Sequence, residues 1–148
     1  EPLYDLKLAA DRIRAAREAI DRSGTGALLT ARCESYLVGQ PDLAATIARL
    51  KAYADAGADC LFAPGLSTRE DVAAVVKAVA PKPVNLIVVS PWITLAEAQA
   101  LGVRRISVGG ALARAAWGSF HNAASEILSK GTFGGFAGPR LDFDRIFG

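Results

Sequence analysis

Hydrophobic residues recur along the chain at two different spacings. From 5 to 22 they occur every three or four positions with charged residues between them, which predicts an amphipathic helix. Four later stretches are short, nearly continuous apolar runs, which are typical of buried strands. These runs lie at 27–31, 60–63, 84–89 and 105–108. The first of them suits a strand that is covered on both faces.

A segment of helical spacing follows each predicted strand. These segments lie at 41–57, 67–79, 94–102 and 111–129. Two of them begin with the spacing of a capping box, Ser67 with Glu70 and Thr94 with Glu97, in which a hydroxyl and a carboxylate each satisfy a free backbone amide. Four strands, each followed by a helix after a short connection, predict an α/β fold with a parallel sheet and right-handed crossovers.

The length of the chain leaves the closure of this sheet open. A complete (β/α)₈ barrel needs about 250 residues, and the chain has 148. The four strands therefore form either an open sheet or one half of a barrel. The sequence contains no Met, so translation cannot start at Glu1, and we expect the chain to be a piece of a longer protein.

Composition excludes several classes of protein. The 17 Lys and Arg residues are scattered and nearly balanced by 15 Asp and Glu, which argues against a nucleic-acid partner. No apolar stretch approaches the ~18 residues of a membrane span, and no signal peptide is recognisable, so we expect a cytoplasmic protein without a membrane partner. Cys33 and Cys60 lie in apolar surroundings without a CxxC motif, which predicts a reducing compartment and no structural zinc.

Residues that follow the predicted strands are the candidates for chemistry, because parallel α/β folds bind ligands where strands end. Arg32 directly follows an apolar run, and its guanidinium suits a carboxylate or phosphonate. The alternative is a structural ion pair with Glu34, which points to the same side of a strand. Ser107 and Gly109 lie in a strand-to-helix turn whose amides could face an anion, or which simply needs glycine. The only histidine, His121, is expected to have a packing or surface role.

Several segments in order resemble the phosphoenolpyruvate mutase and isocitrate lyase superfamily. The similarity spans Pro2 to about Gly134 and is closest to the branch of phosphonomutase-like and carboxyvinyl-carboxyphosphonate phosphorylmutase-like proteins. The segments that carry it are PLYDLKLAADRIRAAREA, TARCESYLVG, AYADAGADCLFAPG, LGVRRISVGGALARAA and KGTFG.

The resemblance implies a (β/α)₈ TIM barrel of the phosphoenolpyruvate-binding type. This chain would supply strands five to eight and the final helix, with 1–134 as the C-terminal half of one barrel domain and 135–148 as a C-terminal tail. It implies a Mg²⁺-dependent lyase or mutase that cleaves or rearranges a C–C or C–P bond in a small 2-oxo or carboxylate acid through an enolate-like species. The Mg²⁺ ligands would lie on the preceding half, with no metal ligand in this segment. The implied assembly is a homo-oligomer, a dimer of dimers that exchanges the last helix.

The resemblance also assigns site residues by position. Arg32 matches the arginine of the A-R-[TV]-[DE] segment, which implies a catalytic, substrate-binding role, and Glu34 matches the acidic residue that would orient it. Pro64 stands where the mutase proper has a histidine, which argues against true mutase activity. Asn85 comes earlier than the asparagine of the lyase pattern, so it lies either in the pocket or in the core. The substrate-binding residues are predicted to be Arg32, Glu34, Gly65, Asn85, Ser107 and Gly109.

Two other interpretations remain. The chain could be a degenerate half-barrel with a structural or assembly role, or an open α/β module that binds a phosphate-bearing ligand. If the chain is instead half of the lyase or mutase, we expect it to be inactive without the N-terminal half of the barrel.

Overall fold

The computed structural model describes residues 3–138, 142 and 144–145. It divides into two compact units, Glu1–Gly109 and Gly110–Gly148. The first contains the sheet and four helices, and the second contains one long helix and a short 3₁₀ helix. The division into a half-barrel and a tail at 134 remains a prediction, and much of the predicted tail lies outside the described residues.

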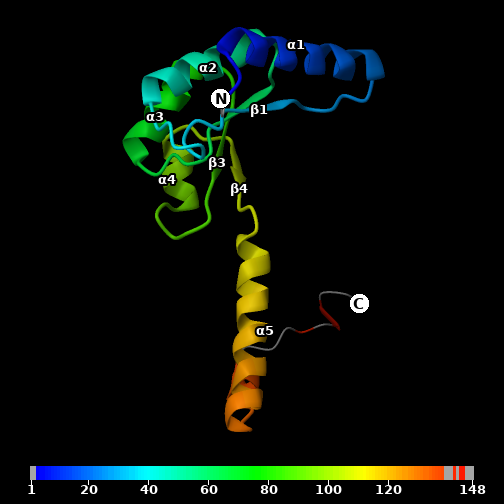
Figure 1. Cartoon of the computed structure of the whole chain (residues 1–148), viewed down its shortest axis with the longest axis vertical. Coiled ribbons are helices and arrows are strands. Elements are labelled where there is room, and N and C mark those ends of the chain that lie inside the picture. Colours follow the sequence, from blue (N-terminus) through cyan, green and yellow to red (C-terminus); the bar gives the residue numbers. More distant parts are fainter. Residues whose placement is uncertain (1–2, 139–141, 143, 146–148) are drawn as a thin grey trace. The chain divides into compact units, whose positions relative to one another are not determined.

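The sheet of the first unit is fully parallel. Its strands are β1 (Thr30–Arg32), β2 (Cys60–Phe62), β3 (Val84–Ile87) and β4 (Arg105–Ser107), and they lie side by side in sequence order (Figure 1). Each predicted strand is present but shorter than its apolar run. Residues 27–29 precede β1 and 88–89 follow β3, and within these flanks Leu28 is 81% exposed. Hydrophobic side chains alone therefore do not mark where the strand pairing starts.

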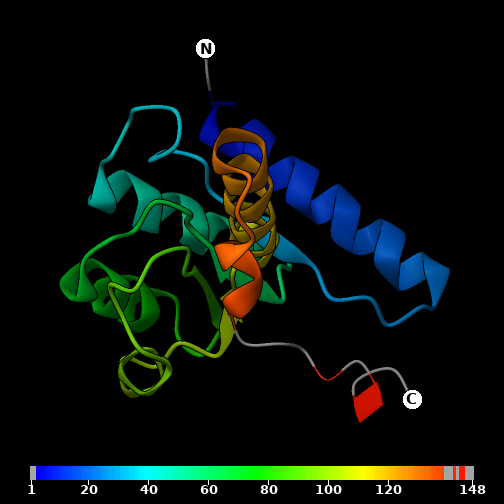
Figure 2. The same ribbon diagram turned by 90° about the horizontal axis from the view of Figure 1, so that it is seen from below.

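The helices of this unit are α1 (Leu6–Ser23), α2 (Leu43–Asp55), α3 (Arg69–Val79) and α4 (Leu95–Ala100). Figures 1 and 2 show α2, α3 and α4 on the same side of the sheet. A doubly wound sheet reverses its strand order and covers both faces, whereas a barrel keeps the sequence order with its helices outside. The observed winding is that of a barrel segment, which confirms the predicted fold class.

Alternate strand residues form the core between the sheet and the helices. Ala31, Leu61 and Leu86 are at most 1% exposed and pack in one cluster with Leu50 of α2 and Val75 of α3. Their neighbours along the strands point to the opposite face, which these helices do not cover. The prediction that the first strand is covered on both faces is therefore wrong, because β1 runs from half-buried Thr30 through buried Ala31 to exposed Arg32.

Side-chain caps start the helices. The Thr94–Glu97 capping box is confirmed, with the Thr94 amide donating to Glu97 at 2.7 Å and the Glu97 amide donating to the Thr94 hydroxyl at 3.2 Å. The prediction for Ser67 is wrong by one residue. The cap of α3 is Thr68, whose extended backbone lets its hydroxyl accept from the amide of Asp71 at 3.1 Å.

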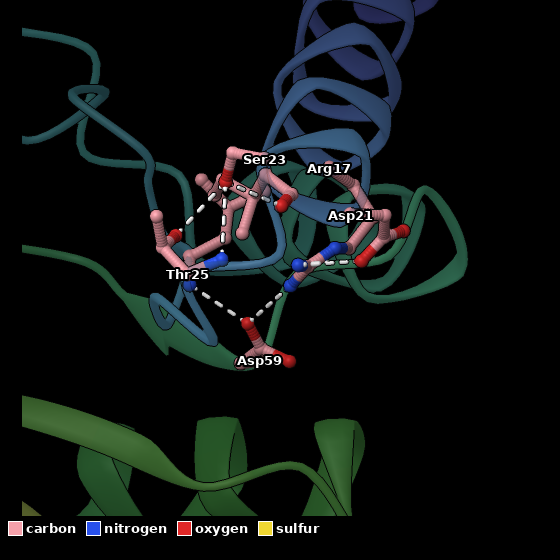
Figure 3. Close-up of polar contacts among 7 residues, drawn as sticks. Arg17, Asp21, Ser23, Thr25 and Asp59 are labelled. Atoms are coloured by element: carbon pink, nitrogen blue, oxygen red, sulfur yellow. Dashed lines mark hydrogen bonds and ion pairs between the residues drawn. The ribbon is translucent and has the colours of Figure 1, made fainter.

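An ion-pair cluster ties the end of α1 to the start of β2, and Figure 3 shows Arg17 between Asp21 and Asp59. Its guanidinium lies 2.8 Å from Asp59 and 2.7 Å from Asp21. The same Asp59 oxygen accepts from the amide of Leu29 at 2.7 Å, just before β1. Gly57 permits this approach, because a Cβ there would lie 2.7 Å from Cγ of Arg17 and its φ is +101°. The cluster fixes the amino ends of the first two strands.

The second unit contains α5 (Ala111–Lys130) and the 3₁₀ helix Gly134–Ala137. Glu126 of α5 accepts from the Thr132 hydroxyl and from the amides of Gly134 and Gly135, at 2.6–2.9 Å. These hydrogen bonds lower the pKa of Glu126, and the one from Thr132 has the largest effect. No residue of α5 is buried, and its large apolar side chains Leu112, Trp117, Phe120 and Leu128 are 63–88% exposed. None of the helices in the described ranges is long and apolar enough to cross a membrane.

Candidate functional site

One row of side chains crosses the face of the sheet that α2, α3 and α4 leave uncovered. The strand register pairs Arg32 with Phe62, Phe62 with Asn85, and Asn85 with Arg105. Partners in parallel register project from the same face, and residues two positions on project there as well. We call this surface, formed by Arg32, Glu34, Phe62, Asn85, Arg105 and Ser107, the polar face.

Arg32 is held at one end of the row by two contacts. Its guanidinium forms a two-point ion pair with Glu34, through Nε to Oε1 and through Nη2 to Oε2 at 3.3 Å. It also lies over the Phe62 ring, 5.2 Å from the centroid. The ion pair with Glu34, which the sequence offered as the alternative to a ligand role for Arg32, is present. It leaves room for a ligand because the guanidinium has five N–H donors and Glu34 engages two. The side chain is 49% exposed.

The segment after β1 is anchored by buried polar atoms on both sides of Glu34. The Cys33 amide donates to the carbonyl of Phe62 at 2.8 Å, which extends the pairing between β1 and β2. The Ser35 hydroxyl lies 3.4 Å from the Cys33 sulfur and 2.6 Å from the Thr46 hydroxyl of α2. All three side chains are at most 5% exposed. These contacts fix the backbone that presents Glu34 to Arg32.

Asn85 lies on the polar face and is also almost completely buried, at 1% exposed. Its carbonyl oxygen accepts from Nη1 of Arg105 at 3.0 Å, and its amide nitrogen donates to the Ser107 hydroxyl at 3.1 Å. The structure therefore brings together two predicted site residues, Asn85 and Ser107. The sequence reasoning missed Arg105, although its position two residues before Ser107 in the same strand is a signal that both share a face.

The two predicted site glycines are explained by the backbone. Gly65 has a φ of +101°, and a Cβ there would lie 2.5 Å from Cβ of Tyr36. Gly109 has a φ of +50°, and a Cβ there would lie 3.3 Å from Ile87. The alternative interpretation of Gly109, a turn that needs glycine, accounts for the geometry, and in the described part of the chain neither glycine is hydrogen-bonded to the polar face.

A cavity beside Arg32 has an excess of positive charge. Arg32 and Glu34 line this cavity of about 270 Å³ together with Arg12 of α1 and Arg49 of α2, so its lining contains three guanidinium groups and one carboxylate. A second cavity of about 580 Å³ lies between α1 and α2 and contains neither Arg32 nor Asn85. Cys60 also lies on the uncovered face, but burial raises the pKa of its thiol, so the thiolate is disfavoured.

The described residues do not fit a magnesium site. Magnesium takes oxygen ligands, chiefly carboxylates, and the only carboxylate of the polar face, Glu34, is paired with Arg32. Within ranges 3–138, 142 and 144–145, no group of three or more His, Cys, Asp or Glu residues could hold a metal ion.

Comparisons with known proteins give this geometry a context. The sequence matches the family described as phosphoenolpyruvate phosphomutase over residues 1–128. An uncharacterized protein of Mycobacterium tuberculosis is 36% identical over 110 residues, which are 74% of this chain and 40% of that protein. A Burkholderia cenocepacia protein described as a lyase or mutase is 46% identical, with a TM-score of 0.89 over 96% of this chain and 51% of its own.

Two further solved structures carry information about chemistry. A 2,3-dimethylmalate lyase of the PEP mutase and isocitrate lyase superfamily is 32% identical, with a TM-score of 0.78 over 95% of this chain and 48% of its own. A phosphonopyruvate hydrolase solved with oxalate and Mg²⁺ is 27% identical, with a TM-score of 0.75 over 94% of this chain and 50% of its own. The chain thus spans about half the length of these structures, or less in the mycobacterial relative.

Proposed function

Because the chain belongs to the phosphoenolpyruvate phosphomutase family, we propose that it is the C-terminal half of a barrel enzyme that breaks or rearranges a C–C or C–P bond in a small carboxylate-bearing acid. Solved relatives include enzymes named for such acids, 2,3-dimethylmalate and phosphonopyruvate. We place the binding site of such an anionic substrate on the polar face, which carries Arg32 and Arg105 and would form the inner side of the barrel wall.

The observation that carries the proposal is the geometry of Arg32. Its guanidinium lies over the Phe62 ring and is paired with Glu34, so the planar fork has little freedom and its remaining donors are presented together. We assign Arg32 to binding the carboxylate or phosphonyl oxygens of the substrate and Glu34 to orienting Arg32. Ser107, which accepts from the amide of buried Asn85, supplies a neutral hydrogen-bonding group further along the same face.

We place the magnesium ligands outside this chain. One solved relative holds oxalate and Mg²⁺, whereas the described residues supply no fitting set of carboxylates. The half of the barrel that the relatives have and this chain does not span is the remaining source. This assignment predicts that Mg²⁺ binds to the full-length protein and that variants of the polar face leave Mg²⁺ affinity unchanged, as isothermal titration calorimetry would measure.

We also propose that the protein is a homo-oligomer in which α5 packs against another copy. The support is the exposed apolar surface of α5, where Trp117 and Phe120 stack edge to face with ring centroids 5.5 Å apart. Light scattering after size exclusion tests this proposal. We expect an oligomer that dissociates when Trp117 and Phe120 are both replaced by Ser, and a monomeric full-length wild type would contradict it.

The test of the proposed activity uses the full-length protein and Mg²⁺ with 2,3-dimethylmalate, oxaloacetate and phosphonopyruvate. We expect turnover of at least one acid, and a loss in kcat/KM of about ten- to a hundredfold for Arg32→Lys, because Lys keeps the charge and loses the fork. Arg14→Lys is the matched control, since its pair with Asp11 has similar exposure and lies on α1. Equal turnover by Arg32→Lys and the wild type would refute the role of Arg32.

A further inference from the structure

Arg105 fixes which end of the Asn85 side-chain amide faces which neighbour. A guanidinium can only donate, so the Asn85 atom 3.0 Å from Nη1 of Arg105 is the carbonyl oxygen. The amide NH₂ then faces Ser107 and donates to its hydroxyl oxygen at 3.1 Å. Because Asn85 is 1% exposed, water cannot readily replace either partner.

The orientation of the Asn85 amide determines whether the Ser107 hydroxyl can donate its proton to a ligand. A serine hydroxyl has one proton and can accept as well as donate. Since Ser107 accepts from Asn85, its proton is left for another acceptor. If the amide were reversed, its carbonyl oxygen would face Ser107 and take that proton, and the hydroxyl would then present only lone pairs, which repel an anion.

We infer that Arg105 is a positioning residue: it fixes the side-chain amide of Asn85 so that Ser107 donates its hydroxyl proton to the anionic substrate. This inference rests on the proposed function of the polar face and adds the residue that sets the direction of the hydrogen bond between Asn85 and Ser107. The three side chains come from adjacent strands, β3 and β4, whose register places Arg105 directly beside Asn85 and Ser107 two residues further on. Ser107 is only partly buried, so its hydroxyl can reach a ligand.

A direct role of Arg105 in substrate binding makes a different prediction. If Arg105 acts through Asn85 and Ser107, its removal and the removal of the Ser107 hydroxyl eliminate the same hydrogen bond, so the two effects do not add. If Arg105 binds the anion itself, the effects add. Arg105→Lys retains a donor-only group and should preserve the amide direction, whereas Arg105→Met should not.

The experiment combines oxalate binding with a direct observation of the amide, in the full-length protein with Mg²⁺. The chain has only two asparagines, so selective ¹⁵N-asparagine labelling gives few signals from it, and exposed Asn122 is an internal reference. We expect a nuclear Overhauser effect between the Asn85 NH₂ and the Ser107 Cβ protons in the wild type and in Arg105→Lys. We expect its loss in Arg105→Met, with amide exchange at least about tenfold faster.

Oxalate affinity is measured on the same samples by calorimetry. We expect Arg105→Met and Ser107→Ala each to weaken binding about ten- to a hundredfold, and the double variant to be no weaker than the worse single one by more than about threefold. Arg104→Met, which removes the charge directly before β4, is the matched control and should bind as the wild type does.

The possible failures are separable. Retention of the Overhauser effect in Arg105→Met overturns the orienting role, whatever the enzyme binds. Additive losses of oxalate affinity, or an unchanged affinity in Arg105→Met, overturn the connection to Ser107. If the wild type does not bind oxalate but the amide signal behaves as expected, the proposed function fails and the orienting role of Arg105 stands.

Discussion

The buried hydroxyl pair of Ser35 and Thr46 is a sharp test of how the segment after β1 is held. Their oxygens lie 2.6 Å apart, Thr46 is fully buried and Ser35 is 5% exposed. Thr46→Val preserves the shape of the side chain and removes the hydroxyl. Ser35→Ala removes the other partner.

The structure sets the size of each effect. Loss of one partner of a buried hydrogen bond costs about 1–3 kcal/mol, whereas replacing both partners by apolar groups is nearly neutral. In Thr46→Val, Ser35 keeps its contact with the Cys33 sulfur at 3.4 Å, so we expect a loss near the lower end, about 1 kcal/mol. In Ser35→Ala, the Thr46 hydroxyl loses the partner that the structure gives it, and we expect about 1–2 kcal/mol.

Equilibrium unfolding in urea, followed by circular dichroism, measures the free energies of unfolding. The double variant removes both partners and should be destabilised less than the worse single variant, which gives a coupling energy of at least about 1 kcal/mol. Thr25→Val is the matched control, because it breaks an exposed hydroxyl pair with Ser23 at 2.9 Å and should change stability by less than about 0.5 kcal/mol. Simple additivity of the two buried substitutions would refute the reasoning.

Three further predictions concern the ends of the elements. Hydrogen bonds from Thr94 hold the pKa of Glu97 at about 2, below its ordinary value of 4.5. Ionised Glu97 therefore stabilises the fold above pH 4.5, and this contribution is lost as the pH falls toward 2. The difference in unfolding free energy between the wild type and Glu97→Gln should accordingly become smaller from pH 5 to 2.5. Gly65→Ala should lower the melting temperature, because the new Cβ meets Tyr36 at a positive φ. Asp59→Asn should cost about 1–2 kcal/mol in urea unfolding, because one partly exposed oxygen accepts from two donors.

A different result would contradict each of these three predictions. A stability difference for Glu97→Gln that stays constant from pH 5 to 2.5 would mean that the carboxylate gains nothing from its cap. An unchanged melting temperature for Gly65→Ala would show that the turn relaxes freely. For Asp59→Asn, a loss no larger than that of the exposed Asp11→Asn would show that the cluster at the amino ends of the strands contributes little.

The candidate site shows where reasoning from sequence reached its limit. Arg32 and Glu34 are two residues apart at the end of β1, so their shared face follows from the two-residue period, and the sequence already offered their ion pair as one of two roles for Arg32. Arg105 and Asn85 are 20 positions apart, and only the register of β3 on β4 brings them together. Register depends on how whole strands pack, which no local pattern specifies.

The order of strands and helices, the α/β class and the Thr94 cap were determined by the sequence alone, because periodicity and capping act over a few residues. The tertiary structure decided which face of each strand the helices cover, that Thr68 rather than Ser67 begins α3, and that Asn85 is buried between Arg105 and Ser107. These outcomes depend on contacts between segments distant in the sequence. The local pattern allows either face of a strand to be buried, and the packing of the helices on one side of the sheet decides which face it is.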